Sequence, residues 1–198
     1  MMIREEIKLL EKLDYNKQLI FAYLTCERLY SNYVFFSRRF EFGNELILRS
    51  AIDFIYSSLL ITGPPNQNHI ESYIEKVDSN TPDTEDFSTI FVSSALDSCT
   101  AILETLDFMV DKNVSRLRDI ATFATDTVDM YVGDRDELDY NTDPLFEDKI
   151  LNDPMMQREL NIQKGIVSYL IDIDVLEKLD INNLLNLQYN NGKSNIDL

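Results

Sequence analysis

The fold is decided by residues 19–43, which read LIFAYLTCERLYSNYVFFSRRFEFG. Apolar and aromatic side chains recur there every three or four residues, which is the spacing of one broad face of an α-helix. Asp14 or Asn16 can cap the start of this helix, and Gly43-Asn44 ends it. We expect the helix to lie in the core, with any surplus aromatic surface available for an oligomer or partner interface.

The same helical period continues through most of the chain, and 198 residues suit one domain. Breaks are expected at Gly63-Pro64-Pro65 and at Pro82. No strand is expected, because the β-prone residues 89–92 lie inside a helical pattern. The sequence predicts an all-α, single-domain bundle of about seven or eight helices. Ile7, Leu10 and Leu13 line a short first helix before the one quoted above. The remaining expected helices cover residues 44–62, 70–78, 83–110, 113–132, 154–173 and 175–189.

Two segments stand outside this pattern. Residues 133–153 are irregular and rich in acids, and we expect an exposed acidic loop with one helical turn at most. Asp153 can then cap a helix that has Pro154 in its first turn. Residues 190–198 form a polar C-terminal tail.

Charge is distributed unevenly along the chain. Residues 1–53 hold eight acids and eight bases, whereas residues 54–198 hold 27 acids and ten bases, which is the whole net charge of -17. Such a surface repels phosphate backbones and anionic lipid and attracts basic proteins. We therefore expect no nucleic-acid or membrane partner but a basic protein partner. The residues expected to bind it are Asp134, Asp136, Glu137 and Asp139.

Several chemistries are excluded by what the chain lacks. His69, in an expected polar loop, is its one histidine, and neither Cys26 nor Cys99 has a second cysteine nearby, so no zinc site or His-based triad is predicted. Both thiols are expected to be free and buried. No Gly-rich phosphate loop, signal peptide or apolar run of membrane-spanning length is present, which indicates a cytosolic protein without a cofactor.

Asp139, Asn141 and Asp143 copy the first three ligand positions of a calcium-binding loop. Pro144 then stands where that loop requires glycine, and Ile150 stands where it requires glutamate. The sequence therefore predicts a solvated acidic loop here and no metal site.

Two other carboxylate pairs support an alternative function. Glu104 and Asp107 lie one helical turn apart, as do Asp126 and Asp129 on the next expected helix. This spacing resembles the paired acidic motifs of all-α nucleotide pyrophosphohydrolases, which hold magnesium against a triphosphate. The alternative is thus a magnesium-dependent hydrolase that uses these four residues.

Within residues 21–43, Cys26-Glu27-Arg28 is followed by Asn32-Tyr33 and Phe42-Gly43. This pattern resembles the YjaG-like family of bacterial proteins, a domain of unknown function. The resemblance implies an all-helical cytosolic protein of this length and carries over no catalytic residue. Further matches are Asp53, residues 82–87, Ala95, Asp97 and Cys99, Asp153-Pro154, residues 157–163 and residues 194–196.

The motif has two interpretations. Glu27 and Arg28 on a buried helix require partners, because an unpaired buried charge is costly. Asp97 or Asp53 can pair with Arg28, which would make the motif an internal clamp between helices; the other interpretation is a functional site. The leading function is a non-enzymatic interaction or regulatory module, for instance of the immunity-protein kind, and a homo-oligomer stays open.

Overall fold

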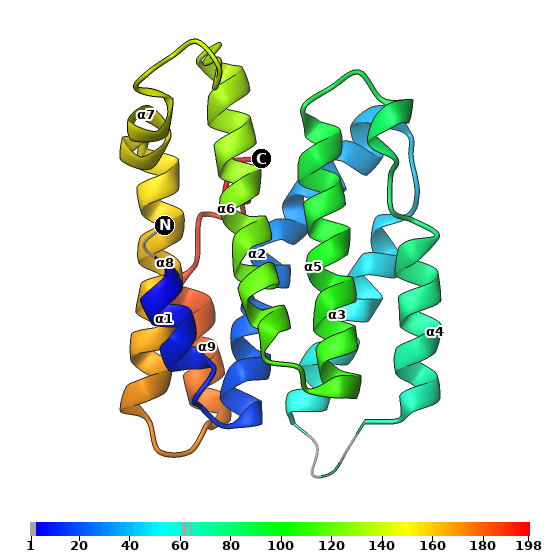
Figure 1. Cartoon of the computed structure of the whole chain (residues 1–198). Helices are drawn as coiled ribbons and strands as arrows, with labels where there is room; N and C mark the ends of the chain where they lie inside the picture. Colours follow the sequence, from blue (N-terminus) through cyan, green and yellow to red (C-terminus); the bar gives the residue numbers. More distant parts are fainter. Residues whose placement is uncertain (1–2, 61–62, 64) are drawn as a thin grey trace.

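A computed structural model describes residues 3–60, 63 and 65–198 (Figure 1). Within them no β-strand occurs, so the predicted all-α class is confirmed, and nine α-helices are found where about seven or eight were expected. The α-helices are α1 (Ile3–Leu10), α2 (Tyr15–Phe40), α3 (Glu45–Leu59), α4 (Gln67–Asp78), α5 (Phe91–Asp111), α6 (Ser115–Arg135), α7 (Phe146–Asn152), α8 (Pro154–Asp172) and α9 (Lys178–Leu187), and η1 (Thr84–Asp86) is a 3-10 helix.

Helix α2 lies at the centre of the bundle. Asp14 caps it by accepting hydrogen bonds from the backbone N–H groups of Asn16 and Lys17. Its residues 17–26 are all buried, since α3, α5, α6, α8 and α9 all contact it. Polar side chains in such a buried stretch must find their hydrogen-bond partners within the protein.

Polar residues in the first turn of α2 bind the ends of neighbouring helices. Gln18 donates from Nε2 to the carbonyl oxygens of Glu11 and Leu13, at 3.1 and 3.0 Å. Lys17 donates from Nζ to the carbonyl oxygen of Ile173, just after α8. Carbonyls at the end of a helix have no partner in their own helix, so these contacts join α1 and α8 to the central helix.

The other helices lie on two sides of α2, α5 and α6 (Figure 1). Helices α3 and α4 pack together on one side, and α1, α8 and α9 form the other. Helices α5 and α6 form an antiparallel hairpin, and α6 also packs against α8. None of the helices in the described part of the chain has the length and apolar character of a membrane span.

The start of α5 differs from the prediction. Asp83 caps only the short helix η1, and α5 begins at Phe91 without a side-chain cap. Phe87 is extended between the two, and its ring packs against Phe36 at 4.9 Å and Phe42 at 5.5 Å between centroids. Placing Phe87 in this aromatic cluster takes residues 87–90 out of the helix, a tertiary effect that periodicity does not report.

The connection from α3 to α4 also differs. Helix α3 ends at Leu59, before the break predicted at Gly63-Pro64-Pro65. Pro64 lies outside the described residues. His69 lies on α4 rather than in a loop, because Asn66 caps that helix by accepting from the backbone N–H groups of Asn68 and His69. The imidazole is exposed.

The acidic segment and the tail are more ordered than expected. Residues 133–135 belong to α6, and α7 forms a further helix whose Ile150 packs with Val128 and Met156. Asp153 caps α8 as predicted, whereas α9 begins at Lys178 rather than near Val175. Residues 194–196 are buried, so the polar tail turns back into the bundle (Figure 1).

Candidate functional site

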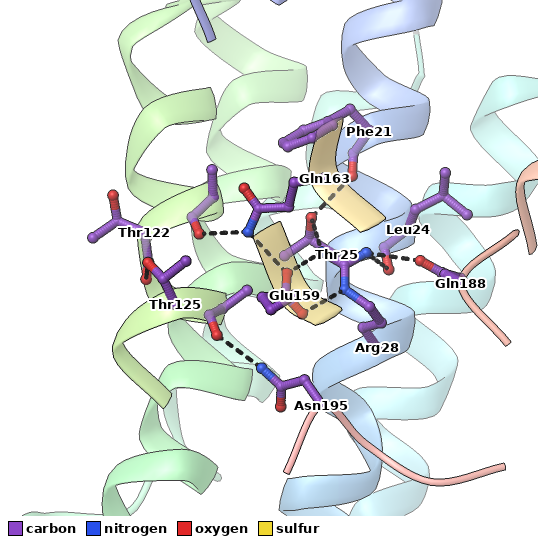
Figure 2. A network of polar contacts seen from close by, with 12 residues as sticks. Phe21, Leu24, Thr25, Arg28, Thr122, Thr125, Glu159, Gln163, Gln188 and Asn195 are labelled. Atoms are coloured by element: carbon purple, nitrogen blue, oxygen red, sulfur yellow. Dashed lines mark hydrogen bonds and ion pairs between the residues drawn. The ribbon is translucent and has the colours of Figure 1, made fainter. Parts of the chain in front are cut away.

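Arg28 of the Cys26-Glu27-Arg28 motif is enclosed by polar partners (Figure 2). Its Nε and Nη2 donate to the two carboxylate oxygens of Glu159 on α8, at 3.1 and 2.9 Å. Its Nη1 donates to Gln188 Oε1 at 2.7 Å and to the Leu24 carbonyl at 3.2 Å, and Nη2 also reaches Thr25 Oγ1 at 3.4 Å. A guanidinium has five N–H groups, so every donor of Arg28 is occupied.

The network extends from Glu159 across the bundle. Gln163 donates from Nε2 to Glu159 Oε1 at 2.8 Å and to the Ala121 carbonyl of α6 at 3.1 Å. Glu159 is 1% exposed, so its charge is neutralised within the protein by Arg28. The clamp therefore joins α2, α6, α8 and the end of α9.

Asn32 and the C-terminal segment add a second polar connection. Asn32 donates from Nδ2 to Asn195 Oδ1 at 3.1 Å, and Asn195 donates to the Ala124 carbonyl at 2.8 Å. Arg158 donates to the Asn195 carbonyl at 2.8 Å. These contacts explain why residues 194–196 are buried: the tail supplies an amide that α2 and α6 both use.

Glu27 forms a separate ion pair on another face of α2. It accepts two hydrogen bonds from Arg49 of α3, at 2.8 and 2.7 Å, and Arg49 also donates to Asp53 at 2.9 Å. The guanidinium carbon of Arg49 lies 5.2 Å from the centre of the Tyr30 ring. Glu27 thus serves α2–α3 packing while Arg28 serves α2–α8 packing.

The predicted partners of Arg28 were wrong. Asp53 is bound by Arg49, and Asp97 accepts a hydrogen bond from Thr127 at 2.7 Å, so neither reaches Arg28. Glu159 takes that position because α8 packs beside α2, a pairing that sequence spacing does not determine. The geometry supports the clamp interpretation, since Arg28 has no donor left for a ligand.

Both cysteines are free and buried, as expected. Cys26 Sγ lies 3.3 Å from Thr105 Oγ1. Burial raises the pKa of each thiol to about 12. Such thiols stay protonated and unreactive at neutral pH, so Cys26 and Cys99 contribute packing.

Tyr33 fixes the turn after α2. Its hydroxyl donates to the Asn80 carbonyl at 2.8 Å, which connects α2 to the end of α4. Gly43 has a φ of 64°, and a Cβ atom at this position would lie 2.2 Å from the Tyr33 hydroxyl oxygen. The Phe42-Gly43 part of the motif is therefore required by backbone conformation and by close packing.

The four carboxylates of the hydrolase alternative are not brought into one group. Glu104 and Asp107 pair with Arg116, at 2.5 and 3.3 Å, near the α5–α6 turn. Asp126 and Asp129 instead line a small pocket beside α7. Across the described ranges, no three His, Cys, Asp or Glu side chains are arranged to hold a metal ion.

Asp97 is the acid with the most unusual titration. Burial raises its pKa to about 7, and the nearby charge of Asp126 adds to this shift. The hydrogen bond from Thr127 opposes the shift because it favours the carboxylate. Asp97 therefore changes charge near neutral pH.

The calcium-like residues form a local turn. Asp139 accepts from the Asn141 backbone N–H at 2.8 Å and from the Thr142 hydroxyl at 2.9 Å. Asp143 pairs with Lys149 at 2.5 Å. The carboxylates are thus used as turn caps and in an ion pair.

Sequence reasoning did not identify most of the polar partners in these networks. Glu159 and Asn195 lie in the 157–163 and 194–196 stretches that match the family pattern, so a signal for them was present. Arg49 and Gln188 had none, because exposed-looking polar residues on helices are common and only packing shows which are buried.

The structure is thus an all-helical bundle whose central helix is held by an internal Arg–Glu clamp. The chain belongs to the family described as "Protein of unknown function (DUF416)", which it matches over residues 6–198. The resemblance to YjaG-like proteins is thereby confirmed.

Similar proteins occur in other bacteria. "Uncharacterized protein YjaG" of Salmonella typhimurium is 26% identical over 166 residues, 83% of this chain and 81% of that protein. The Escherichia coli protein of the same name is 25% identical over the same coverage. The crystal structure of a DUF416 family protein from Shewanella baltica superposes with a TM-score of 0.86, at 24% identity and covering 97% of both chains.

Proposed function

We propose that this protein is a non-enzymatic, cytosolic interaction module that binds a basic protein partner through residues 133–153, in a regulatory or immunity-like role. One observation carries the proposal. Asp134, Asp136, Glu137 and Asp139 are all exposed, and they lie together at the end of α6 and in the loop that follows it.

The bases of this segment do not cancel its charge. Arg135 is held by Asp136 and Asp153, each at 2.7 Å, and Lys149 is held by Asp143. Both cations are therefore engaged inside the segment, and Asp136 is one of their partners. The carboxylates of Asp134, Glu137 and Asp139 are exposed and form no salt bridge within the described residues. A surface of this kind accelerates encounter with a basic partner.

Apolar side chains stand beside these acids. Tyr140 is 69% exposed and Leu145 is 55% exposed. The Tyr140 ring meets the edge of the Phe146 ring at 5.6 Å, which holds its position. Exposed aromatic side chains are frequent energetic centres of protein interfaces, so the segment offers anchors as well as charge.

The non-enzymatic part of the proposal is supported by the use of the polar groups elsewhere. Every donor of Arg28 is occupied, Glu27 is held by Arg49, and both thiols are buried. The motif residues thus serve helix packing, which leaves the exposed segment as the best candidate for function.

The test is a charge-reversal variant carrying Asp134→Lys, Asp136→Lys, Glu137→Lys and Asp139→Lys. A partner is isolated from native cells with the wild-type protein and purified, and its association rate with each protein is measured at low and physiological salt. We expect the reversal to slow association at least tenfold, roughly the gain that electrostatic steering provides, and added salt to slow the wild type.

A matched variant reverses four exposed acids on other elements and should associate at nearly the wild-type rate. The control positions are Glu5, Glu71, Asp172 and Asp174. Equal slowing by both variants would show that net charge acts without a defined surface. Partners that are acidic or neutral, or binding that is indifferent to salt, would contradict the proposal, as would measurable affinity for DNA or RNA.

A further inference from the structure

A polar pocket of about 310 Å³ lies between α2 and the segment that follows α9. Arg28 and Ser31 line it from α2, and Gln188, Gly192 and Lys193 line it from the C-terminal side. Volumes of this size are typical of small-molecule sites. The pocket is separate from the acidic segment proposed above to bind a partner.

Gln188 presents a fixed donor to this pocket. The side chain is buried, at 7% exposure, and its Oε1 accepts from Arg28 Nη1 at 2.7 Å (Figure 2). Because Arg28 can only donate, the amide orientation is settled, and Nε2 is the end left over. Within the described residues Nε2 has no hydrogen-bond partner, and it is not among the fully enclosed unpaired atoms. The clamp thus orients an unused N–H donor in the pocket wall.

Other groups around the pocket are also donors. The Ser31 hydroxyl and the Asn186 amide line it, and neither makes a side-chain hydrogen bond within residues 3–60, 63 and 65–198. Lys193 lies at the rim, is exposed, and forms no salt bridge in the same part of the chain. Gln188 Nε2 and the Lys193 ammonium can only donate, whereas the Ser31 hydroxyl and the Asn186 amide can donate or accept, so the wall offers several donors to a ligand with acceptor oxygens.

The charges at the pocket point the same way. Glu27 is paired with Arg49 at 2.7 Å, which it shares with Asp53, and Arg28 is paired with Glu159 at 2.9 Å. Asp197, which lies near Lys193, is bound by Arg158 at 2.9 Å. Lys193 forms no salt bridge within the described residues, and its charge helps to lower the pKa of Asp197.

The geometry points to a binding site for a small carboxylate-containing molecule in this pocket. The carboxylate accepts from Gln188 Nε2 and from the Ser31 hydroxyl, while Lys193 supplies the opposite charge. Planar carboxylates suit an amide N–H beside an ammonium, since charge-assisted hydrogen bonds are the stronger ones. The site is assembled only in the folded chain, because the clamp holds Gln188 in place.

The experiment uses the full-length protein, labelled with ¹⁵N, and titrates acetate, succinate and glutamate at constant ionic strength. The side-chain amide resonance of Gln188 is assigned by comparison with Gln188→Ala and followed in the wild type. We expect at least one of the three carboxylates to shift it saturably. Lys193→Gln and Ser31→Ala should each weaken binding by about tenfold, the effect of losing a charge-assisted hydrogen bond.

Lys164→Gln is the matched control, because Lys164 is an exposed lysine of α8 that does not line the pocket. It should bind with wild-type affinity. An unshifted Gln188 amide with all three probes, or equal weakening by Lys164→Gln, would overturn the proposal. Inorganic phosphate is a parallel arm, and saturable binding of phosphate without any carboxylate binding would overturn the ligand class. None of these readouts involves a protein partner, so they are independent of the acidic segment.

Discussion

Replacing Arg28 by Met tests whether the motif is a structural clamp. Methionine keeps much of the aliphatic volume and removes only the guanidinium, so the measurement isolates the charge and its hydrogen bonds. In the variant, Glu159 keeps only the hydrogen bond from Gln163, and Gln188 Oε1 loses its donor.

The expected cost follows from burial. Arg28 and Glu159 are 6% and 1% exposed, so solvent cannot replace the lost partner. Breaking a buried ion pair costs about 3–5 kcal/mol because the remaining charge is left unpaired. For a chain of this size that lowers the melting temperature by roughly 6–20 °C, at about 2–4 °C per kcal/mol.

The assay is urea denaturation followed by far-UV circular dichroism, with the free energy of unfolding obtained by linear extrapolation. Arg118→Met is the control, since Arg118 is 63% exposed and its ion pair with Glu11 spans 3.5 Å. It should cost about 0–1 kcal/mol. The double variant Arg28→Met with Glu159→Met should be more stable than Arg28→Met alone, because it removes the unpaired charge as well.

Two results would refute this reasoning. An Arg28→Met protein within about 1 kcal/mol of wild type would place the pair in the range of exposed ion pairs. A double variant with the summed cost of both single variants would show that the two side chains stabilise the fold independently.

Two further predictions concern stability. Asp97 has a folded pKa of about 7 and an unfolded pKa of about 3.9, so the folded state binds more protons and wild-type stability should fall as pH rises from about 4 to about 7. Asp97→Asn should remove that part of the dependence of unfolding free energy on pH and should stabilise the protein above pH 7 in denaturation curves. Asp172→Asn, at an exposed position, should keep the pH dependence. An unchanged pH dependence in Asp97→Asn would contradict the raised pKa of Asp97. Gly43→Ala should destabilise the protein by about 2–4 kcal/mol, because the left-handed φ and the contact with the Tyr33 hydroxyl are both unfavourable for alanine. Gly192→Ala is the control: it shares the positive φ, but its Cβ would meet no atom within 4 Å, so it should cost only about 1 kcal/mol. Equal costs at the two glycines would show that the close contact with Tyr33 is relieved.

Local signals were sufficient for much of the secondary structure. Asp14, as one of two candidates, and Asp153 were expected to cap helices, and both do so, because an N-cap acts through backbone groups two or three residues away. The start of α5 could not be predicted in this way, since Phe87 leaves the helical path to join an aromatic cluster built by α2.

The candidate site shows the same division. The motif could be found because its charged residues interrupt an otherwise apolar helix. The expected burial of that helix was enough to require partners of opposite charge for Glu27 and Arg28. Which residues those partners are could not be found, because Arg49 and Glu159 lie on helices whose packing against α2 depends on the whole bundle.

The sequence by itself determined the helical class, the central position of α2, the free buried thiols and the excess of acid after residue 53, since each depends on residue type and on spacing within one helix. Only the tertiary structure decided that Glu159 pairs with Arg28, that the tail returns to bind Asn32, and that Gln188 faces a pocket. Those features join residues more than a hundred positions apart, and such contacts form only when helices pack to bury their apolar faces and their remaining polar groups must find one another.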